Sequence, residues 1–177
     1  MRTIEERMAG YAAYHQDHRC QATHLFGVPM VFYSPLIPLG WIRWELGGIE
    51  FSLGMLILAA ILIWYFTLDR GLAGILTLIS LPMVYLTDLA ATLPFQQSLA
   101  IFLALKIGGW VIQLVGHVFE GRRPALVDNL IQSLMGPLFV LAEVLFYFGF
   151  RKDLEQAVER GVAAHTFAGN EQTAAEA

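Results

Sequence analysis

Long apolar segments constrain this chain of 177 residues more than any other feature of its sequence. A helix needs about 20 apolar residues to cross the hydrocarbon of a bilayer. Hydrophobic residues make up 56% of the chain and charged residues only 15%, against about 25% in a soluble domain. We therefore predict an all-α, polytopic integral membrane protein. Its apolar segments are residues 25–42, 47–66, 71–86, 98–119 and 130–150.

The first of these segments is interrupted by Pro29, Pro35 and Pro38. Each proline lacks a backbone N–H and clashes with the preceding turn, so this segment is expected to be kinked or re-entrant. Residues 3–16 predict a short amphipathic helix before it. We expect a single membrane-embedded domain over residues 1–150, followed by an exposed helix and a disordered tail over 151–177.

Charge and cysteine content exclude several classes of function. The net charge is −4 and the sequence has no basic stripe, which excludes a nucleic-acid partner. Cys20 is the only cysteine, so no intrachain disulfide can form. No secretory signal peptide is evident at the N-terminus. The sequence sets no oligomeric state.

Five histidines are the main candidates for chemistry, and four of them cluster at the ends of apolar segments. His15, His18 and His24 precede the first segment, while His117 and Glu120 end the fourth. If the first four segments all cross the bilayer, both groups lie at the same membrane face. The arginine distribution favours the cytoplasmic side for that face. The expected location is therefore a bacterial inner membrane, with the site near the cytoplasm.

The spacing of these residues leaves their role open. His117 and Glu120 are three residues apart, so they share one helix face and can converge on a metal ion. A helix-end histidine that is hydrogen-bonded to a neighbouring acid explains the pair equally well. His15 and His24 are nine residues apart, which places them on opposite faces of a continuous helix. They can share a ligand only if the chain turns between them.

The residues between these histidines also have more than one interpretation. His18 is a ligand, a second donor near the ligands, or a solvated residue. Cys20 can offer a thiolate, although a lone cysteine at a membrane edge is more often inert. The polar stretch QDHRCQAT is suited to a turn, with Thr23 as the N-cap of the following helix.

Lys106 and Glu143 lie deep inside apolar segments, where charges are costly and usually paired. Lys106 and Glu143 fall at similar depth on segments expected to be antiparallel neighbours, about 20 Å from one face. We predict that they form a structural pair inside the membrane.

Two motifs resemble a known family. The stretch YHQDHRCQATHLFGVP, together with QLVGHVFEGRRPALVDNLIQSLMGPLFVLAE, resembles the membrane family typified by the fungal 2-hydroxy fatty acid dioxygenase of phytosphingosine degradation. The resemblance covers residues 10–150. In that family the first motif contains asparagine and proline between its two histidines. Here Asp17, His18 and Cys20 take those places, so the histidine frame is retained and the turn differs.

The resemblance implies an Fe(II)-dependent dioxygenase that uses dioxygen to cleave the C1–C2 bond of a 2-hydroxy fatty acid, in a membrane. It implies His15, His24 and His117 as metal ligands, with Glu120 as fourth ligand or as a base. His18 is the next candidate for a catalytic role. We expect three arginines to attract the substrate carboxylate, or to anchor the protein at anionic lipid: Arg19, Arg122 and Arg123.

Two other classes of protein remain open at this stage. A transporter or lipid-binding scaffold would use the histidines structurally, although a transporter would be expected to show interrupted helices in two halves. A metal-dependent lipid hydrolase is the third possibility. The bound metal separates the classes, because iron favours the oxygenase, zinc the hydrolase, and no metal the scaffold.

Overall fold

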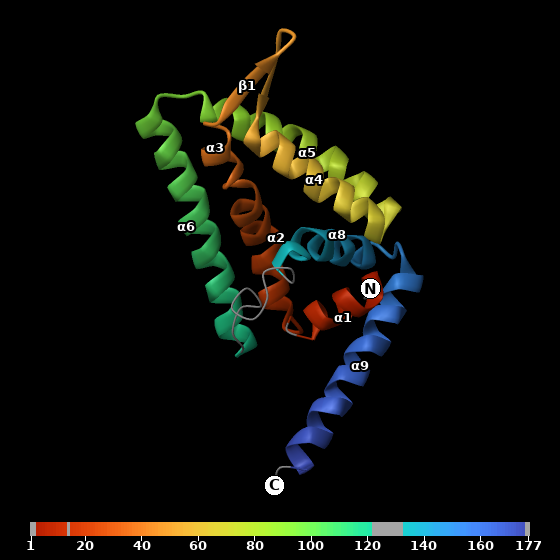
Figure 1. Ribbon diagram of the computed structural model, residues 1–177. Helices are drawn as coiled ribbons and strands as arrows, with labels where there is room; N and C mark the ends of the chain where they lie inside the picture. Colours follow the sequence, from red (N-terminus) through yellow and green to blue (C-terminus); the bar gives the residue numbers. More distant parts are fainter. Residues whose placement is uncertain (1–2, 14, 122–132, 176–177) are drawn as a thin grey trace. The chain divides into compact units, whose positions relative to one another are not determined.

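A computed structural model describes residues 3–13, 15–121 and 133–175 of the chain (Figure 1). The described part consists of helices and one β-hairpin, and it divides into two compact units. Unit 1 comprises residues 1–22 and 115–177, and unit 2 comprises residues 23–114. Two long helices, α2 (His18–Tyr33) and α6 (Phe95–Glu120), pass from one unit into the other.

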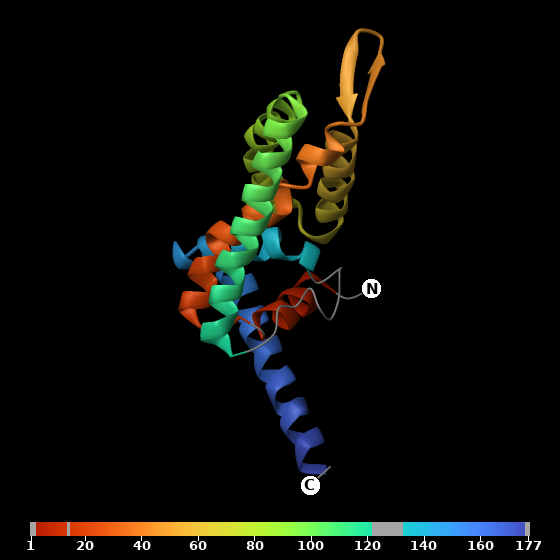
Figure 2. The ribbon, with the colours of Figure 1, turned by 90° about the vertical axis from the view of Figure 1, so that its left-hand side faces the viewer.

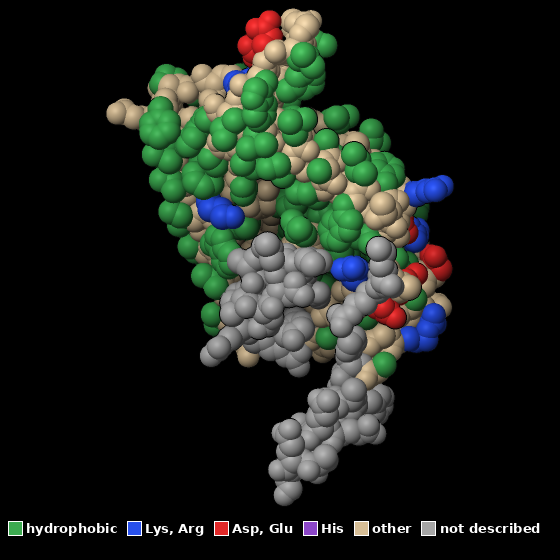
Figure 3. Space-filling model, viewed as in Figure 1, with side chains coloured by type: hydrophobic (Ala, Val, Ile, Leu, Met, Phe, Trp, Pro, Cys, Tyr) green, Lys and Arg blue, Asp and Glu red, His purple; other side chains and the backbone are tan. Residues whose placement is uncertain are grey.

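The helical membrane architecture predicted from the sequence is confirmed. Three helical segments in the described residues are long and apolar enough to cross a bilayer: His18–Leu39, Arg70–Ala91 and Phe95–Glu120. Two shorter apolar helices accompany them, α4 (Leu53–Leu68) and α8 (Gly136–Tyr147). Hydrophobic side chains cover much of the face shown in Figure 3.

The prolines of the first segment kink it without preventing a helix. Helix α2 continues through Pro29 and ends at Tyr33. Two turn residues, Ser34 and Pro35, separate it from the short α3 (Leu36–Leu39). The break falls there because the ring of Pro35 disfavours helical geometry at the residue before it.

A β-hairpin is the main departure from the predicted all-helical fold. Strands β1 (Arg43–Leu46) and β2 (Ile49–Ser52) pair antiparallel, and Leu46 lies opposite Ile49. The two-residue loop between them is Gly47–Gly48, and both residues have positive φ, 62° and 80°. Hairpin turns of this length require that conformation, which glycine adopts without a Cβ penalty.

The hairpin shortens the second apolar segment. The predicted span over 47–66 begins as strand β2, and helix α4 starts only at Leu53. Ser52 fixes that start, because its Oγ accepts a hydrogen bond from the backbone N–H of Met55 at 3.3 Å. Figures 1 and 2 both show the hairpin projecting beyond the end of α4.

Helix α5 (Arg70–Ala91) follows α4 after Asp69, and the two helices pack along each other (Figure 1). Arg43 at the base of the hairpin contacts Asp88 near the end of α5, with 2.6 Å between Nη2 and Oδ1. The indole Nε1 of Trp41 donates to Ser98 Oγ near the start of α6, at 2.8 Å. The hairpin base, the end of α5 and the start of α6 therefore meet at one end of unit 2.

Helices α2 and α6 cross closely within unit 2. A Cβ placed on Gly109 would lie 2.8 Å from Met30 Cβ and 2.9 Å from Val31 Cγ2. A Cβ on Gly27 would meet Gln113 Cγ at 2.7 Å. Small residues allow membrane helices to approach in this way, and here glycine is needed on both helices.

Unit 1 contains α1 (Ile4–Ala12), α8 and α9 (Lys152–Ala175). Helix α1 is the short N-terminal helix predicted from the sequence, and it packs against α9. At that contact a Cβ on Gly161 would lie 2.5 Å from Ala9 Cβ. The sequence predicts disorder at the end of the chain, whereas α9 continues to Ala175. Alanine, glutamate and glutamine are good helix formers, which accounts for the extension.

Helix α8 is shorter than the span predicted over 130–150. Its twelve residues cover about 18 Å, which is too short to cross a bilayer. Residues 130–132 of that span lie outside the described part of the chain.

Candidate metal centre

His15 is held in a fixed orientation at the end of α1. Its ring stacks on Tyr11, with the ring centroids 4.2 Å apart and an interplanar angle of 8°. Its Nδ1 lies 2.9 Å from the carbonyl oxygen of Tyr11. A carbonyl oxygen only accepts hydrogen bonds, so Nδ1 carries the hydrogen and Nε2 is the nitrogen suited to bind a metal.

The chain turns immediately after His15, and α2 begins at His18. The sequence predicts a turn between His15 and His24, but places it later, with Thr23 as the N-cap. In the structure Thr23 lies inside α2, and Asp17 precedes the helix instead. Asp17 Oδ1 accepts a hydrogen bond from the backbone N–H of Arg19 at 2.8 Å, which is typical of a residue at a helix start.

This early turn brings His15 to one face of α2. Cys20 and His24 are four residues apart on that helix, so they share a face. The ligand atoms of His15, Cys20 and His24 all lie within 4.8 Å of one another, and all three residues are buried. The group is formed by one short stretch of chain, residues 15–24. The sequence did not assign Cys20 to the site, although its spacing from His24 is a usable signal.

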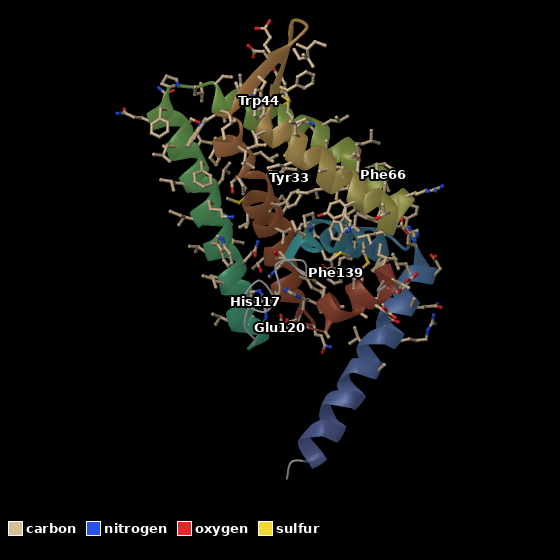
Figure 4. All side chains as sticks on the ribbon, viewed as in Figure 1. Tyr33, Trp44, Phe66, His117, Glu120 and Phe139 are labelled. Atoms are coloured by element: carbon tan, nitrogen blue, oxygen red, sulfur yellow. The ribbon has the colours of Figure 1, made fainter. Side chains whose placement is uncertain are left out.

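His117, near the end of α6, lies beside His15 in unit 1. The centroids of the two imidazole rings are 5.1 Å apart, and the rings meet edge to face. His117 is 6% exposed. Phe139 of α8 packs against Tyr11 at 4.6 Å between ring centroids, and its own centroid lies 6.4 Å from that of His15. The side chains of His117, Glu120 and Phe139 can be followed in Figure 4. The rings of Tyr11 and Phe139 shield His15 from water.

Glu120 binds the turn that follows His15. Its Oε1 accepts a hydrogen bond from the backbone N–H of Gln16 at 2.9 Å, and its Oε2 accepts one from the backbone N–H of Asp17 at 2.8 Å. The carboxylate therefore connects the end of α6 to the start of α2. This contact differs from a hydrogen bond to His117, which was one of the two sequence interpretations. The predicted roles of Glu120 as a metal ligand or as a base stay predictions.

The exposed residues at the start of α2 contact one another. His18 Nδ1 lies 3.1 Å from Gln21 Oε1, and His18 is outside the buried group of donors. Arg19 forms an ion pair with Asp17 at 2.9 Å and lies over the ring of Phe119, 4.5 Å from its centroid. The hydrogen bonds from Arg19 lower the pKa of Asp17 to about 2. Arg122 and Arg123 lie outside the described residues.

The predicted Lys106–Glu143 pair stays a prediction, because the two residues belong to different units. Lys106 Nζ donates to the carbonyl oxygen of Val31 at 3.4 Å. Glu143 lies near Tyr11: burial raises the pKa of the Tyr11 hydroxyl well above its usual value, and the nearby charge of Glu143 adds to this. Tyr11 therefore remains a neutral phenol.

The donor set around His15 is suited to a transition metal. Two atoms that bind one such ion lie at most about 4.4 Å apart, since metal–nitrogen and metal–sulfur bonds are about 2.0–2.3 Å long. The separations within 4.8 Å among His15, Cys20 and His24 need only small side-chain movements to meet this limit. Imidazole nitrogen suits iron, zinc and copper, and thiolate sulfur also suits the softer ions.

The helices and the buried donors thus define a helical, membrane-associated protein with a candidate metal centre. Within this class the chain belongs to the Mpo1-like family, whose model, described as 2-hydroxy-palmitic acid dioxygenase Mpo1-like, matches residues 1–148. The chain is 35% identical over 159 residues to the 2-hydroxy-palmitic acid dioxygenase MPO1 of Saccharomyces cerevisiae. The match covers 88% of this chain and 87% of that protein. No solved structure matches the chain significantly.

Proposed function

We propose that this protein is an Fe(II)-dependent, membrane-embedded dioxygenase that cleaves the C1–C2 bond of 2-hydroxy fatty acids. The observation that carries the proposal is the position of His15, which lies in the buried group with Cys20 and His24 and beside His117. The yeast relative named for action on 2-hydroxy-palmitic acid supplies the substrate class. Iron, when bound, supplies the redox chemistry by which dioxygen reacts with the acid.

The overall reaction balances with one dioxygen for each acid. C2 becomes the carboxyl carbon of a fatty acid shortened by one carbon, C1 leaves as carbon dioxide, and one water forms. Four electrons pass from C1 and C2 to dioxygen. No further reductant is required.

Each residue has a distinct part in this proposal. His15, His24 and His117 hold iron, and Cys20 is an additional donor beside them. The backbone carbonyl of Tyr11 orients His15 through the bond at 2.9 Å. Glu120 keeps the turn after His15 in place. The substrate carboxylate is attracted by arginines at the same membrane face, Arg19, Arg122 and Arg123, and that face is the cytoplasmic one.

Metal analysis of purified variants tests the ligand set. We expect His15→Ala, His24→Ala and His117→Ala each to lose iron, with loss of oxygen consumption on 2-hydroxypalmitate. His18→Ala is the matched control, because His18 is exposed and should retain iron. Full iron occupancy in His117→Ala would contradict the proposal.

The identity of the metal separates the proposal from its competitors. Iron together with oxygen consumption supports the dioxygenase. Zinc in the wild-type protein, with release of a fatty acid from a lipid ester, would establish a hydrolase instead. The absence of any bound metal in the wild-type protein would favour a transporter or lipid-binding scaffold.

A further inference from the structure

Unit 2 contains an apolar cavity of about 470 Å³ that the proposed chemistry does not yet use. Its walls come from α2, α3, α5 and α6, and include Met30, Tyr33, Ile37, Ala90, Ile101 and Leu105. A volume of this size is within the range of about 300–1,000 Å³ that is usual for small-molecule sites.

The hydroxyl groups of Tyr33 and Thr87, which line the cavity, form hydrogen bonds within the protein. The hydroxyl of Tyr33 lies 2.7 Å from Ser80 Oγ. Thr87 Oγ1 donates to the carbonyl oxygen of Met83 at 2.9 Å. The cavity therefore presents hydrocarbon on its sides, and a hydrocarbon chain is the occupant that fits.

A buried hydrophobic cluster lies at one end of the cavity. Ile37, Ala90 and Ala91 form a buried cluster, and Ile101 and Leu105 pack against it. The cluster lies at the end of the cavity near α3, which follows the C-terminal end of α2. A hydrocarbon chain that ran along the cavity to this end would meet these buried side chains.

The other end of the cavity approaches His24 along α2, and both belong to unit 2. Pro29 lines the cavity and follows His24 by five residues, or about 8 Å of helix. Ile37, which also lines the cavity, lies about 20 Å along the chain from His24. His24 and the cavity residues of α2 occupy different faces of that helix. An acyl chain that runs from His24 into the cavity must therefore curve around α2. An extended hydrocarbon advances about 1.2 Å per bond, so a palmitoyl chain of 14 bonds beyond C2 reaches about 17 Å.

We propose that this cavity holds the acyl chain of the 2-hydroxy fatty acid, with the terminal methyl group toward Ile37. The length of the cavity then determines which chain lengths the protein accepts. The identity of the acid rests on the proposed function, whereas the position of its hydrocarbon chain rests on unit 2 alone.

Changing the size of side chains in the buried cluster tests the proposal in lipid nanodiscs that contain the full chain. Ala90→Phe shortens the cavity and should lower the ratio of turnover on 2-hydroxypalmitate to that on 2-hydroxydecanoate about tenfold or more. Ile101→Ala lengthens the cavity and should move the preference toward chains longer than palmitate. Ala104→Phe and Leu103→Ala are the matched controls, since both residues are exposed on α6 and lie outside the cavity lining.

Unchanged ratios in both cavity variants would overturn the proposal while leaving the dioxygenase intact. If Ala90→Phe fails to fold, Ile101→Ala alone decides, because it only removes side-chain atoms.

A binding measurement removes the dependence on turnover. A 2-hydroxy fatty acid with a diazirine at its terminal carbon should crosslink to residues 83–93, at the end of α5 and just after it, or to residues 101–105 of α6. Excess 2-hydroxypalmitate should displace it. Labelling confined to the lipid-facing side of α4, or labelling that the acid does not displace, would show that the cavity is filled by bulk lipid and would overturn the proposal. This result stands even if the protein proves not to be a dioxygenase.

Discussion

At the scale of single residues, the orientation of His15 depends on both the ring and the backbone of Tyr11. The carbonyl fixes which nitrogen carries the hydrogen, and the stacked ring fixes the plane of the imidazole. Groups that orient a metal ligand usually contribute about 10- to 100-fold in metal affinity. Tyr11 is therefore a positioning residue, although it contacts no metal itself.

Replacing Tyr11 tests this role. We expect Tyr11→Leu, which keeps the carbonyl and removes the ring, to weaken iron binding about tenfold. Tyr11→Phe keeps the ring and should bind iron as the wild type does. Iron dissociation measured against a competing chelator gives both values. Equal affinity in Tyr11→Leu and the wild type would show that the stacked ring does not position His15.

Asp17 offers a second test at this scale, because its carboxylate accepts bonds from both the side chain and the backbone of Arg19. These bonds favour the charged form and lower the pKa to about 2. Their contribution to stability is therefore complete above the ordinary pKa of about 3.9 and is lost as the pH falls toward 2. Carbon-detected NMR should show Asp17 titrating near pH 2 in the wild type. In Arg19→Gln the pKa should move back up, and an unchanged value would exclude the ion pair as its cause.

Among the residues of the site, the sequence located the histidines more reliably than their surroundings. His15, His24 and His117 were expected together, and the structure places His15 beside each of the other two. Cys20 was set aside because a lone cysteine carries little information, and its contribution depends on where α2 begins. Glu120 was expected at a metal or at His117, but backbone N–H groups 103 and 104 residues away engage it, which no local pattern encodes.

At the scale of elements, the close crossing of α2 and α6 depends on Gly109. Alanine there would place its Cβ 2.8 Å from Met30 Cβ and 3.1 Å from the carbonyl oxygen of Gly27. The helices would have to separate, at a cost of about 1–3 kcal/mol. Gly74 in α5 is the matched control, because no atom lies within 4 Å of a Cβ built there.

We expect Gly109→Ala to lower the thermal unfolding midpoint in detergent, and Gly74→Ala to raise it, since alanine in a helix gains about 0.5–1 kcal/mol over glycine. A higher midpoint for Gly109→Ala would mean that the helices do not approach as closely as described.

The hairpin shows why the sequence could not divide its second apolar segment. Trp44, Leu46, Ile49 and Phe51 lie on one face of the hairpin, and the opposite face carries Arg43, Glu45, Glu50 and Ser52. The apolar residues of β2 continue directly into α4, so hydrophobicity alone joins the two elements. The signals of the true boundary are local ones, the glycine pair and the serine cap.

At the scale of the whole molecule, the number of crossings determines which ends of the chain share a membrane face. We expect the segment His18–Leu39 to cross once, which would place the hairpin on the second side of the membrane. Because Arg43 reaches Asp88, α5 ends on the hairpin side, so a crossing by α5 would require α4 to have returned the chain to the first side. Helix α6 starts beside Trp41, so a crossing by α6 would return His117 and Glu120 to the face where we expect His18.

This topology requires α4 to cross with only 16 residues, about 24 Å, which is less than the usual thickness of the hydrocarbon. Single cysteines in a Cys20→Ser background test it with a membrane-impermeant maleimide on sealed vesicles. We expect His18→Cys and Arg70→Cys to label from one side and Glu45→Cys only from the other, because α4 and α5 turn on the first side. If Arg70→Cys labels together with Glu45→Cys, α4 does not cross. Because α5 ends beside Arg43, α4 and α5 would then both stay on the hairpin side, and the crossings predicted for these two segments would be wrong.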